Sequence, residues 1–312
     1  MPPGCCHPPR ARSRPARGTR VRPDVASWGH EVPDPPGGAA VTLTLDTALR
    51  SVAGEHRSHN EDSAGCAPGY AFVADGVGGH AGGDVASWTV AHRLMSALAA
   101  SGPDRFTAED LRAAVATANA DLAERARSDP SLAGMATTFT GVFCAEEAVR
   151  VVHIGDSRAY LWRDGEGRRV TRDDSLVQLL VEAGVIDPAE AAHHPRRNVI
   201  LHCLAGDAED AAHVTVLEVD ARPGDRWLMS TDGLTDYVPE ERVLALLGTP
   251  GGPEAVAEAL VGEALDADAW DNVTVVVADV VAARADAPAG PGGERVRLAG
   301  AAADARLPAT AG

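Results

Sequence analysis

Segments with the pattern of β-strands follow one another closely along this chain, and segments with the pattern of helices are grouped between them. We expect paired strands with grouped helices to build an α+β layered domain rather than a parallel doubly wound sheet. The extended segments are short and bounded by turn residues. They are predicted at 41–48, 70–74, 137–144, 149–154, 159–162, 214–219, 226–231 and 273–280.

Two helices are indicated by apolar residues at helical spacing, one from Val85 to Leu98 and one from Leu111 to Leu122. A further helix start is marked by Asp187 as N-cap, Pro188 in the first turn and Glu190 as the capping-box partner. The helical stretch around that start runs from Ser175 through Ala192.

Composition excludes several classes of function. All 28 basic residues are arginine, so a phosphate-binding loop with its lysine and every Schiff-base mechanism are ruled out. A net charge of -17 argues against a general nucleic-acid binder. The five cysteines form no CxxC motif, and no apolar run is long enough to span a membrane. We therefore expect a reduced, cytoplasmic chain without a secretory signal.

The two ends of the chain differ in composition from its centre. Residues 1–40 are rich in arginine and proline and show no periodicity, so we expect them to be disordered. From Ala282 onward the chain consists largely of Ala, Gly, Pro and Asp with little to bury. A flexible tail is therefore predicted over 282–312.

Four aspartates stand where predicted strands begin or end: Asp75, Asp156, Asp232 and Asp271. Any one of them alone is best interpreted as a turn or cap residue. Strand ends of one sheet layer converge, however, and converging carboxylates repel one another unless a cation lies between them. Hard oxygen ligands beside Gly76 favour Mg²⁺ or Mn²⁺ over zinc. The glycines that follow would let the loop fold back and start a helix near Asp84.

Seven blocks carry a resemblance to a known family: RSHNEDS, VADGVGGHAGG, MATTFTG, HIGDSRAYLWRDG, HPRRNVI, LMSTDGLTDYV and DNVTVVV. In type and order they resemble bacterial metal-dependent serine/threonine protein phosphatases of type 2C, the PPM family. The match runs from about Thr42 to Val281, which implies a phosphatase domain over 41–281. The resemblance implies two packed antiparallel β-sheets flanked by α-helices, an α-β-β-α sandwich with a dinuclear metal cleft at one end.

The resemblance also implies metal ligands. By position, Asp75 matches the residue that bridges two Mn²⁺ or Mg²⁺ ions, with the carbonyl of Gly76 on one of them. Asp232 and Asp271 match the ligands of the other ion. These three aspartates and one glycine form the implied dinuclear site.

Other matched positions surround that site. Asp156 and Asp236 match a weaker third-metal site, and Glu61 and Asp62 match acidic residues that orient metal-bound waters. Arg57 matches the arginine that grips the substrate phosphate, and its planar guanidinium suits phosphate oxygens. The implied catalytic residues are thus Arg57, Asp75 and Asp232.

The implied reaction is hydrolysis of phosphoserine and phosphothreonine on proteins by in-line attack of a metal-bridging hydroxide, without a covalent intermediate. By family analogy the partners are phosphorylated proteins, in particular bacterial Ser/Thr kinases and their substrates, in signal transduction. The segment 175–192 matches the flap beside the active site, the first place to look for substrate selection. We expect a monomer that binds no nucleic acid.

Some positions depart from the family pattern. Ala136 stands where the family usually has glycine, which would strain the turn if that position needs positive φ. Asp174 precedes Ser175 where a histidine is common, and Val77 replaces the histidine of the eukaryotic relatives. His80 and His194 are poor substitutes, because each is as easily solvated or structural as catalytic.

Alternative functions remain open. Ser157 lies in a near match to the nucleophile elbow of serine hydrolases, although the next segment reads as a strand and the elbow needs a helix. Cys144 to Arg150 has cysteine-phosphatase spacing, but two acids and no glycine lie between. Asp266 and Asp268 resemble the start of a calcium loop whose later ligands are missing. The stronger nonenzyme alternative is a degenerate phosphatase fold that acts as a regulatory phosphoprotein-binding module.

Overall fold

In a computed structural model of the chain, the described residues are 43–77, 82–101, 106–145, 148–283 and 296–307. All of them belong to one of the two units into which the chain divides, residues 40–312. The disorder predicted for residues 1–40 lies outside the described residues and stays a prediction, and His80 also lies outside them.

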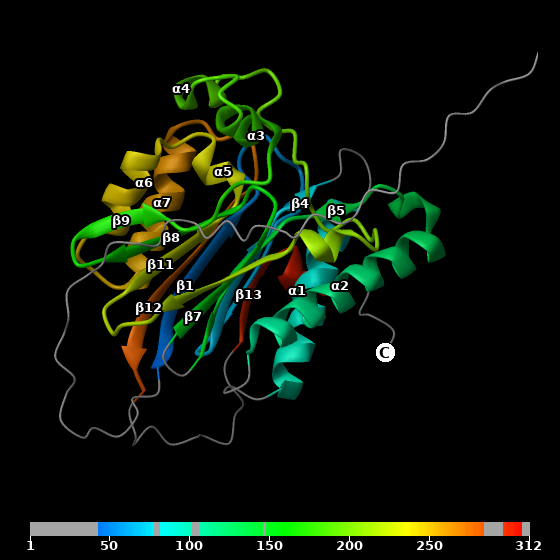
Figure 1. The fold of residues 1–312 in the computed structure, drawn as a ribbon, viewed down its shortest axis with the longest axis horizontal. Coiled ribbons are helices and arrows are strands. Elements are labelled where there is room, and N and C mark those ends of the chain that lie inside the picture. Colours follow the sequence, from blue (N-terminus) through cyan, green and yellow to red (C-terminus); the bar gives the residue numbers. More distant parts are fainter. Residues whose placement is uncertain (1–42, 78–81, 102–105, 146–147, 284–295, 308–312) are drawn as a thin grey trace, which may run out of the picture. The chain divides into compact units, whose positions relative to one another are not determined.

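Two antiparallel sheets form the centre of this unit (Figure 1). The five-stranded sheet has the order β1 (Leu43–Val52), β12 (Val273–Ala282), β11 (Arg226–Ser230), β8 (Arg158–Arg163), β9 (Glu166–Arg169). The six-stranded sheet has the order β10 (Thr215–Asp220), β7 (Ala148–Ile154), β6 (Phe139–Cys144), β3 (Tyr70–Ala74), β2 (Ser63–Ala67), β13 (Arg297–Gly300). A separate two-stranded ribbon pairs β4 (Gly76–Val77) with β5 (Ala136–Thr137).

Helices cover the outer faces of both sheets (Figure 1). The six-stranded sheet is covered by α1 (Gly83–Ser101) and α2 (Ala108–Ser128). The five-stranded sheet is covered by α5 (Asp232–Thr235), α6 (Glu240–Leu247) and α7 (Pro253–Asp266). The predicted α-β-β-α sandwich is therefore confirmed. Short 3-10 turns are η1 (Pro130–Leu132), η2 (Asp210–His213) and η3 (Ala301–Ala303). No helix in the described ranges is long and apolar enough to cross a membrane.

Strand β12 shows why the sequence forms this sandwich. Its apolar residues do not alternate with polar ones, because both of its faces are buried. Val275 and Val277 pack toward α7 and its neighbours, whereas Val276 and Ala278 pack between the two sheets. One unbroken apolar run thus supplies both an outer and an inner core.

The flap segment, predicted as a helical stretch with a helix start at Asp187, consists of two short helices. It contains α3 (Leu176–Glu182) and α4 (Pro188–Ala191), separated by a turn. Gly184 has φ +66 and ends α3, since its N–H donates to Val181 O at 2.9 Å and the next N–H, of Val185, donates to Leu180 O at 2.9 Å. The predicted capping box is present, because Glu190 Oε2 accepts from the Asp187 N–H at 2.8 Å. Neither α3 nor α4 has a buried residue.

The tail beyond Ala282 also differs from the prediction. Residues Arg297–Gly300 form β13 on the edge of the six-stranded sheet, paired antiparallel with β2. Ala301 and Ala302 follow in η3 and are only 3% exposed each. The predicted flexible tail is therefore wrong for residues 296–307. Backbone pairing and two small buried side chains hold this segment, and neither appears in the sequence as a long apolar run.

A buried ion pair joins the end of β8 to the turn before β11. Arg163 Nε and Nη2 donate to the two carboxylate oxygens of Asp225 at 2.6 Å each, and the side chains are 9% and 1% exposed. Arg163 Nη2 also donates to Asp220 O at 2.7 Å, and the Arg222 N–H donates to Asp225 at 2.8 Å. Both buried charges are thus paired and hydrogen-bonded, as burial demands.

Candidate metal centre

The four predicted aspartates lie where strands begin or end, at one end of the sandwich. Asp75 follows β3, Asp232 follows β11 as the first residue of α5, and Asp271 precedes β12. Asp156 lies in the turn between β7 and β8. The sandwich brings these turns together because β3 and β7 belong to one sheet and β8, β11 and β12 to the other.

Electrostatic effects on Asp75 and Asp232 show how closely the carboxylates converge. Burial raises the pKa of Asp75 well above its usual value, and Asp232, Asp62, Asp156 and Asp271 raise it further. The pKa of Asp232 is raised to about 7, first by burial and then by Asp236 and Asp271, although a hydrogen bond with Asp75 opposes the shift. Two carboxyl groups at hydrogen-bonding distance need a shared proton or a cation between them.

The donor set fits a hard divalent cation. Asp156 Oδ1 is buried without a hydrogen-bond partner in the described structure, so it has an uncompensated lone pair directed inside the protein. All the converging side-chain groups are carboxylates, which are ligands for Mg²⁺ or Mn²⁺. Within the described ranges, no three His, Cys, Asp or Glu side chains are arranged to hold an ion as they stand. Mg²⁺ usually keeps several of its waters and is bound through one or two carboxylates, so such a site does not need a shell made only of side chains.

Gly76 lies where only glycine fits. A Cβ at this position would lie 2.3 Å from Gly83 O and 2.4 Å from Glu61 O. The backbone at Gly76 therefore packs directly against the start of α1 and against the acidic segment that begins at Glu61. As the glycine-rich sequence predicts, a helix starts beside Asp84.

Two threonines fix the backbone of Asp75. Its carbonyl accepts from Thr137 Oγ1 at 2.8 Å and from the Thr138 N–H at 2.9 Å, while its N–H donates to Thr138 Oγ1 at 3.0 Å. Sequence analysis gave these threonines no role beyond membership of a family block. Ala136 in the same block causes no strain, because positive φ, +87, occurs at Gly134 and not at Ala136.

Glu61 and Asp62 lie beside the aspartates as predicted. Asp62 is 1% exposed, and Thr231 Oγ1 donates to its Oδ2 at 2.9 Å. Burial, followed by Asp232 and Asp271, raises the pKa of Asp62 despite hydrogen bonds from two threonines. Burial and then Asp84 raise the pKa of Glu61. Asp84, which the sequence marked only as the start of a helix, is thus part of the same acidic cluster.

Arg57 lies at the exposed rim of the cluster. Its Nη2 donates to Asp271 Oδ2 at 2.7 Å, and its Nε donates to Trp270 O at 3.2 Å. The side chain is 44% exposed, so much of the guanidinium faces outward. The arginine predicted to hold phosphate is therefore next to a predicted metal ligand and accessible from outside.

A cavity of about 540 Å³ extends from Asp156, Asp232 and Asp236 to the flap helices α3 and α4. Burial raises the pKa of Asp236, while Arg197, five residues beyond the flap, lowers it. Arg197 Nε lies 3.5 Å from Asp236 Oδ2, which links the segment after the flap to the predicted third-metal residues. Asp156 and Asp236 are thus brought together with Asp232, as predicted.

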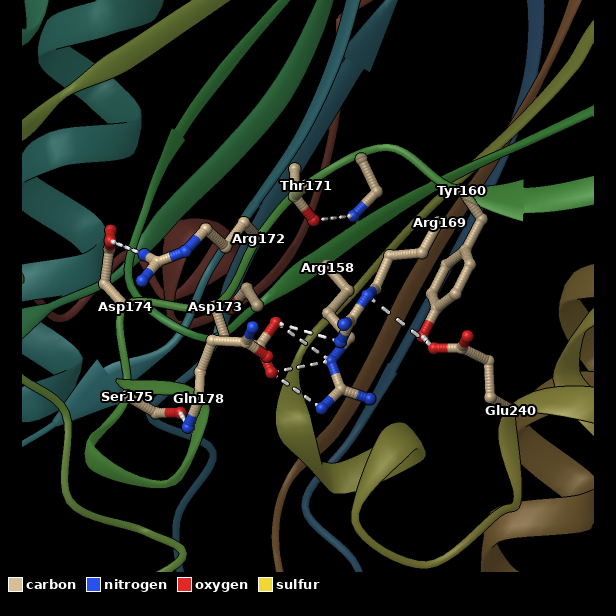
Figure 2. A network of polar contacts seen from close by, with 12 residues as sticks. Arg158, Tyr160, Arg169, Thr171, Arg172, Asp173, Asp174, Ser175, Gln178 and Glu240 are labelled. Carbon is tan, nitrogen blue, oxygen red and sulfur yellow. Dashed lines mark hydrogen bonds and ion pairs between the residues drawn. The ribbon is translucent and has the colours of Figure 1, made fainter. Parts of the chain in front are cut away.

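A polar network holds the base of the flap on β8 (Figure 2). Arg158 makes three hydrogen bonds to Asp173, at 3.1, 3.1 and 2.7 Å. Arg169 lies 3.4 Å from Asp173 and 3.8 Å from Glu240, at the start of α6. The Asp173 side chain is only 7% exposed. Sequence reasoning missed Asp173, although two adjacent acids before the capping serine of α3 were visible.

The departures from the family pattern have structural explanations. Asp174 accepts from the Gly155 N–H at 3.1 Å, and its own N–H donates to Gly155 O at 2.7 Å. Asp174 thereby holds the turn that carries Asp156. Val77 pairs with Ala136 in the β4–β5 ribbon. His194 Nδ1 accepts from the Arg196 N–H at 3.2 Å, a local contact within the flap segment.

Three alternative chemistries find no support. Ser157 is fully buried, its hydroxyl contacts Thr138 Oγ1 at 2.8 Å, and strand β8 follows it instead of a helix. Asp268 contacts His56 Nε2 at 2.9 Å and Trp270 Nε1 at 3.2 Å, and β12 follows rather than a second helix. Cys144 is buried at the end of β6.

Cys144 is expected to be unreactive in the native protein. Burial raises the pKa of its thiol to about 12, so at pH 8 only about one molecule in 10⁴ carries the thiolate. Iodoacetamide at pH 8, followed by peptide mass mapping, should modify Cys144 only after unfolding in urea. A cysteine phosphatase mechanism requires that Cys144→Ser lose all turnover while it stays folded. We expect the folded variant to match the parent in any phosphatase assay.

Comparison with known proteins agrees with the family resemblance found in the sequence. The family model described as "Protein phosphatase 2C" matches residues 56–251. The serine/threonine protein phosphatase PstP of Mycobacterium tuberculosis is 44% identical over 243 residues, 78% of this chain. This chain spans only 46% of the length of PstP. The serine/threonine phosphatase stp of Listeria monocytogenes is 34% identical, and 75% of this chain matches 96% of it.

Solved structures agree with the fold. A crystal structure of Mycobacterium tuberculosis PstP has a TM-score of 0.72 and 41% identity, covering 76% of this chain and 99% of that chain. The PstP catalytic domain in complex with two manganese ions has a TM-score of 0.70 and 41% identity, covering 77% of this chain. The layered fold is therefore shared with these proteins.

Proposed function

This chain belongs to the protein phosphatase 2C family, and from that premise we propose that it removes phosphate from phosphoserine and phosphothreonine residues of proteins. The observation that carries the proposal is the convergence of Asp75, Asp232 and Asp271 beside the exposed Arg57. An acidic chain would repel a phosphoprotein, so attraction must be local to this point.

Each part of the site has a separate task in this proposal. Asp75, Asp232, Asp271 and the Gly76 carbonyl hold two Mn²⁺ or Mg²⁺ ions, and Asp156 with Asp236 can hold a third. When bound, such ions supply a nucleophile at neutral pH and stabilise the charge that develops on the phosphoryl group. Glu61 and Asp62 accept hydrogen bonds from water and so orient it. Arg57 binds the phosphate oxygens.

The flap and its cavity favour a protein substrate over a small one. The cavity beside Asp236 is lined on one side by exposed α3 and α4, where a polypeptide has room to lie. Relatives in this family are named serine/threonine phosphatases. We infer phosphorylated proteins as substrates, with Ser/Thr kinases and their targets as the partners to test.

Phosphate release tests the proposal. Full-length protein should hydrolyse p-nitrophenyl phosphate and a phosphothreonine peptide with Mn²⁺ or Mg²⁺, and a chelator should abolish both activities until metal is restored. Activity that survives chelation would exclude the metal mechanism. A chain that binds the phosphopeptide but never hydrolyses it would be a regulatory binding module instead.

Arg57→Ala should lower kcat/KM for the phosphothreonine peptide by roughly 10- to 100-fold, because charge-assisted hydrogen bonds are worth about 1.5–3 kcal/mol each. Arg57→Lys should recover only part of the loss, since an ammonium cannot form the bidentate fork. Initial-rate kinetics on both variants, with circular dichroism to confirm folding, measure the effect. Unchanged kcat/KM in Arg57→Ala would remove this residue from the phosphate site.

A further inference from the structure

The C-terminal residues 296–303, which we name the C-terminal clasp, contact the acidic segment beside the metal centre. β13 pairs with β2 in a register that sets Arg297 opposite Cys66 and Gly300 opposite Ser63. The next residue, Ala301, then donates its N–H to the carbonyl of Asp62 at 2.7 Å. We propose that the clasp is a positioning element that holds Asp62, and through it the metal ligands, in place.

Gly300 allows the backbone of the clasp to lie close to the backbone of Asp62. It has φ +64, a backbone conformation that favours glycine. A Cβ at this position would lie 2.1 Å from Asp62 O and 2.9 Å from Ser51 Oγ. The two backbones therefore meet without an intervening side chain, so a shift of the clasp must shift Asp62.

Asp62 connects the clasp to the predicted metal ligands. Its Oδ2 accepts from Thr231 Oγ1 at 2.9 Å, and Thr231 immediately precedes Asp232. Thr231 Oγ1 also accepts from the Thr274 N–H at 3.1 Å, close to Asp271 along the chain. Movement of the Asp62 backbone would therefore be passed to two of the three aspartates by short, buried hydrogen bonds.

The clasp has a second anchor on α1. His92 Nε2 donates to Ala302 O at 3.0 Å, and the His92 ring stacks on Trp88 with centroids 4.1 Å apart. Helix α1 begins at Gly83, whose backbone packs on Gly76. The clasp thus fixes the acidic segment and the helix that follows the metal loop at the same time.

The family match does not supply this element. The clasp lies beyond residue 251, where the match to the family model ends. Its sequence, with one valine, one leucine, one glycine and four alanines, also carries no apolar periodicity. The inference rests on the proposed function only in taking Asp75, Asp232 and Asp271 as metal ligands. The contacts between the clasp and Asp62 do not depend on that function.

Two variants of the full chain test the clasp. Gly300→Ala places a Cβ against the Asp62 carbonyl. Ala301→Pro removes the N–H that donates to Asp62 and sets the proline ring against the same carbonyl, at the first position of η3 where proline is otherwise accepted. Gly165→Ala is the control, since Gly165 has φ +86 but a Cβ there meets nothing within 4 Å. It places an alanine at positive φ in the β8–β9 hairpin without displacing a neighbour.

Isothermal titration with Mn²⁺ is the main readout, with p-nitrophenyl phosphate turnover and melting temperature beside it. Both clasp variants should raise the Mn²⁺ dissociation constant about tenfold or more, the usual effect of losing a group that supports metal ligands. Gly165→Ala should leave that constant unchanged. If the clasp variants melt earlier but bind Mn²⁺ as tightly as the parent, the clasp only covers a sheet edge and the proposal is wrong.

Metal binding also separates the two proposals. A parent chain that binds Mn²⁺ without releasing phosphate contradicts the proposed function, and the dissociation constants of the variants still decide on the clasp. A parent chain that binds no Mn²⁺ at all overturns both the metal centre and the role of the clasp in it.

Discussion

Asp75→Asn is expected to abolish phosphate release while the protein stays folded. Asp75 carries the central charge of the cluster, since four other aspartates raise its pKa after burial does. Asparagine keeps the shape and one oxygen but removes the charge that holds a divalent cation. The loss in kcat should be at least roughly 10²- to 10³-fold, the effect of removing a single preorganised electrostatic group.

Stability measurements make this prediction specific. Asparagine removes a buried negative charge that repels its neighbours, so the melting temperature without added metal should not fall. Addition of Mn²⁺ should raise the melting temperature of the parent and have little effect on the variant, because only the parent binds the ion tightly. The reverse pattern, lower stability with full activity per folded molecule, would make Asp75 a turn residue.

Asp225→Ala should lower the free energy of unfolding by about 3–5 kcal/mol, the usual cost of removing one partner of a buried ion pair. The substitution leaves Arg163, whose side chain is 9% exposed, without its bidentate partner. It also removes the acceptor for the Arg222 N–H. Urea denaturation followed by circular dichroism measures the loss.

The exposed pair of Arg242 and Glu263 provides the control. It has the same bidentate geometry, with Arg242 Nε and Nη2 at 2.9 and 2.8 Å from the Glu263 oxygens, but it lies on the surface. Glu263→Ala should therefore change stability little, because solvent already screens the pair. Equal losses in Asp225→Ala and Glu263→Ala would contradict the importance given to burial. The activity per folded molecule of both variants should match the parent, since neither residue lies at the metal centre.

The converging carboxylates could be predicted because each stands where a recognisable strand begins or ends. The run before Asp75 and the run after Asp271 are apolar and short, and an aspartate at such a boundary is visible without any structure. Their convergence followed from the layered fold. The position of Arg57 could be predicted only from the family resemblance, because nothing in its neighbourhood marks it as a phosphate ligand.

Strands β2 and β13 could not be predicted, for a physical reason. β2 reads SAGCA and β13 reads RLAG, so neither offers the β-branched or aromatic side chains that favour a strand. Gly65 in β2 must be small, since a Cβ there would lie 2.5 Å from the Phe72 ring. Both strands are held by pairing with neighbours, which single-sequence periodicity does not record.

The network below the flap was missed for a different reason. Asp173 and Arg158 are separated by a hairpin, and they meet only because β8 and β9 pair. One arginine after Asp156 and two adjacent acids before Ser175 have no spacing that links them. Such side-chain contacts depend on tertiary structure and stay invisible until the register of the strands is known.

The thin packing of the flap has a consequence for how the molecule opens. Neither α3 nor α4 buries a residue, and Leu179 and Val185 are 47% and 65% exposed. Little apolar contact is lost when these helices detach, so their local opening requires far less free energy than unfolding of the sandwich. Amide hydrogens of 176–191 should therefore exchange with solvent long before those of β12, and a protein substrate would meet a segment that opens far more easily than the sheets.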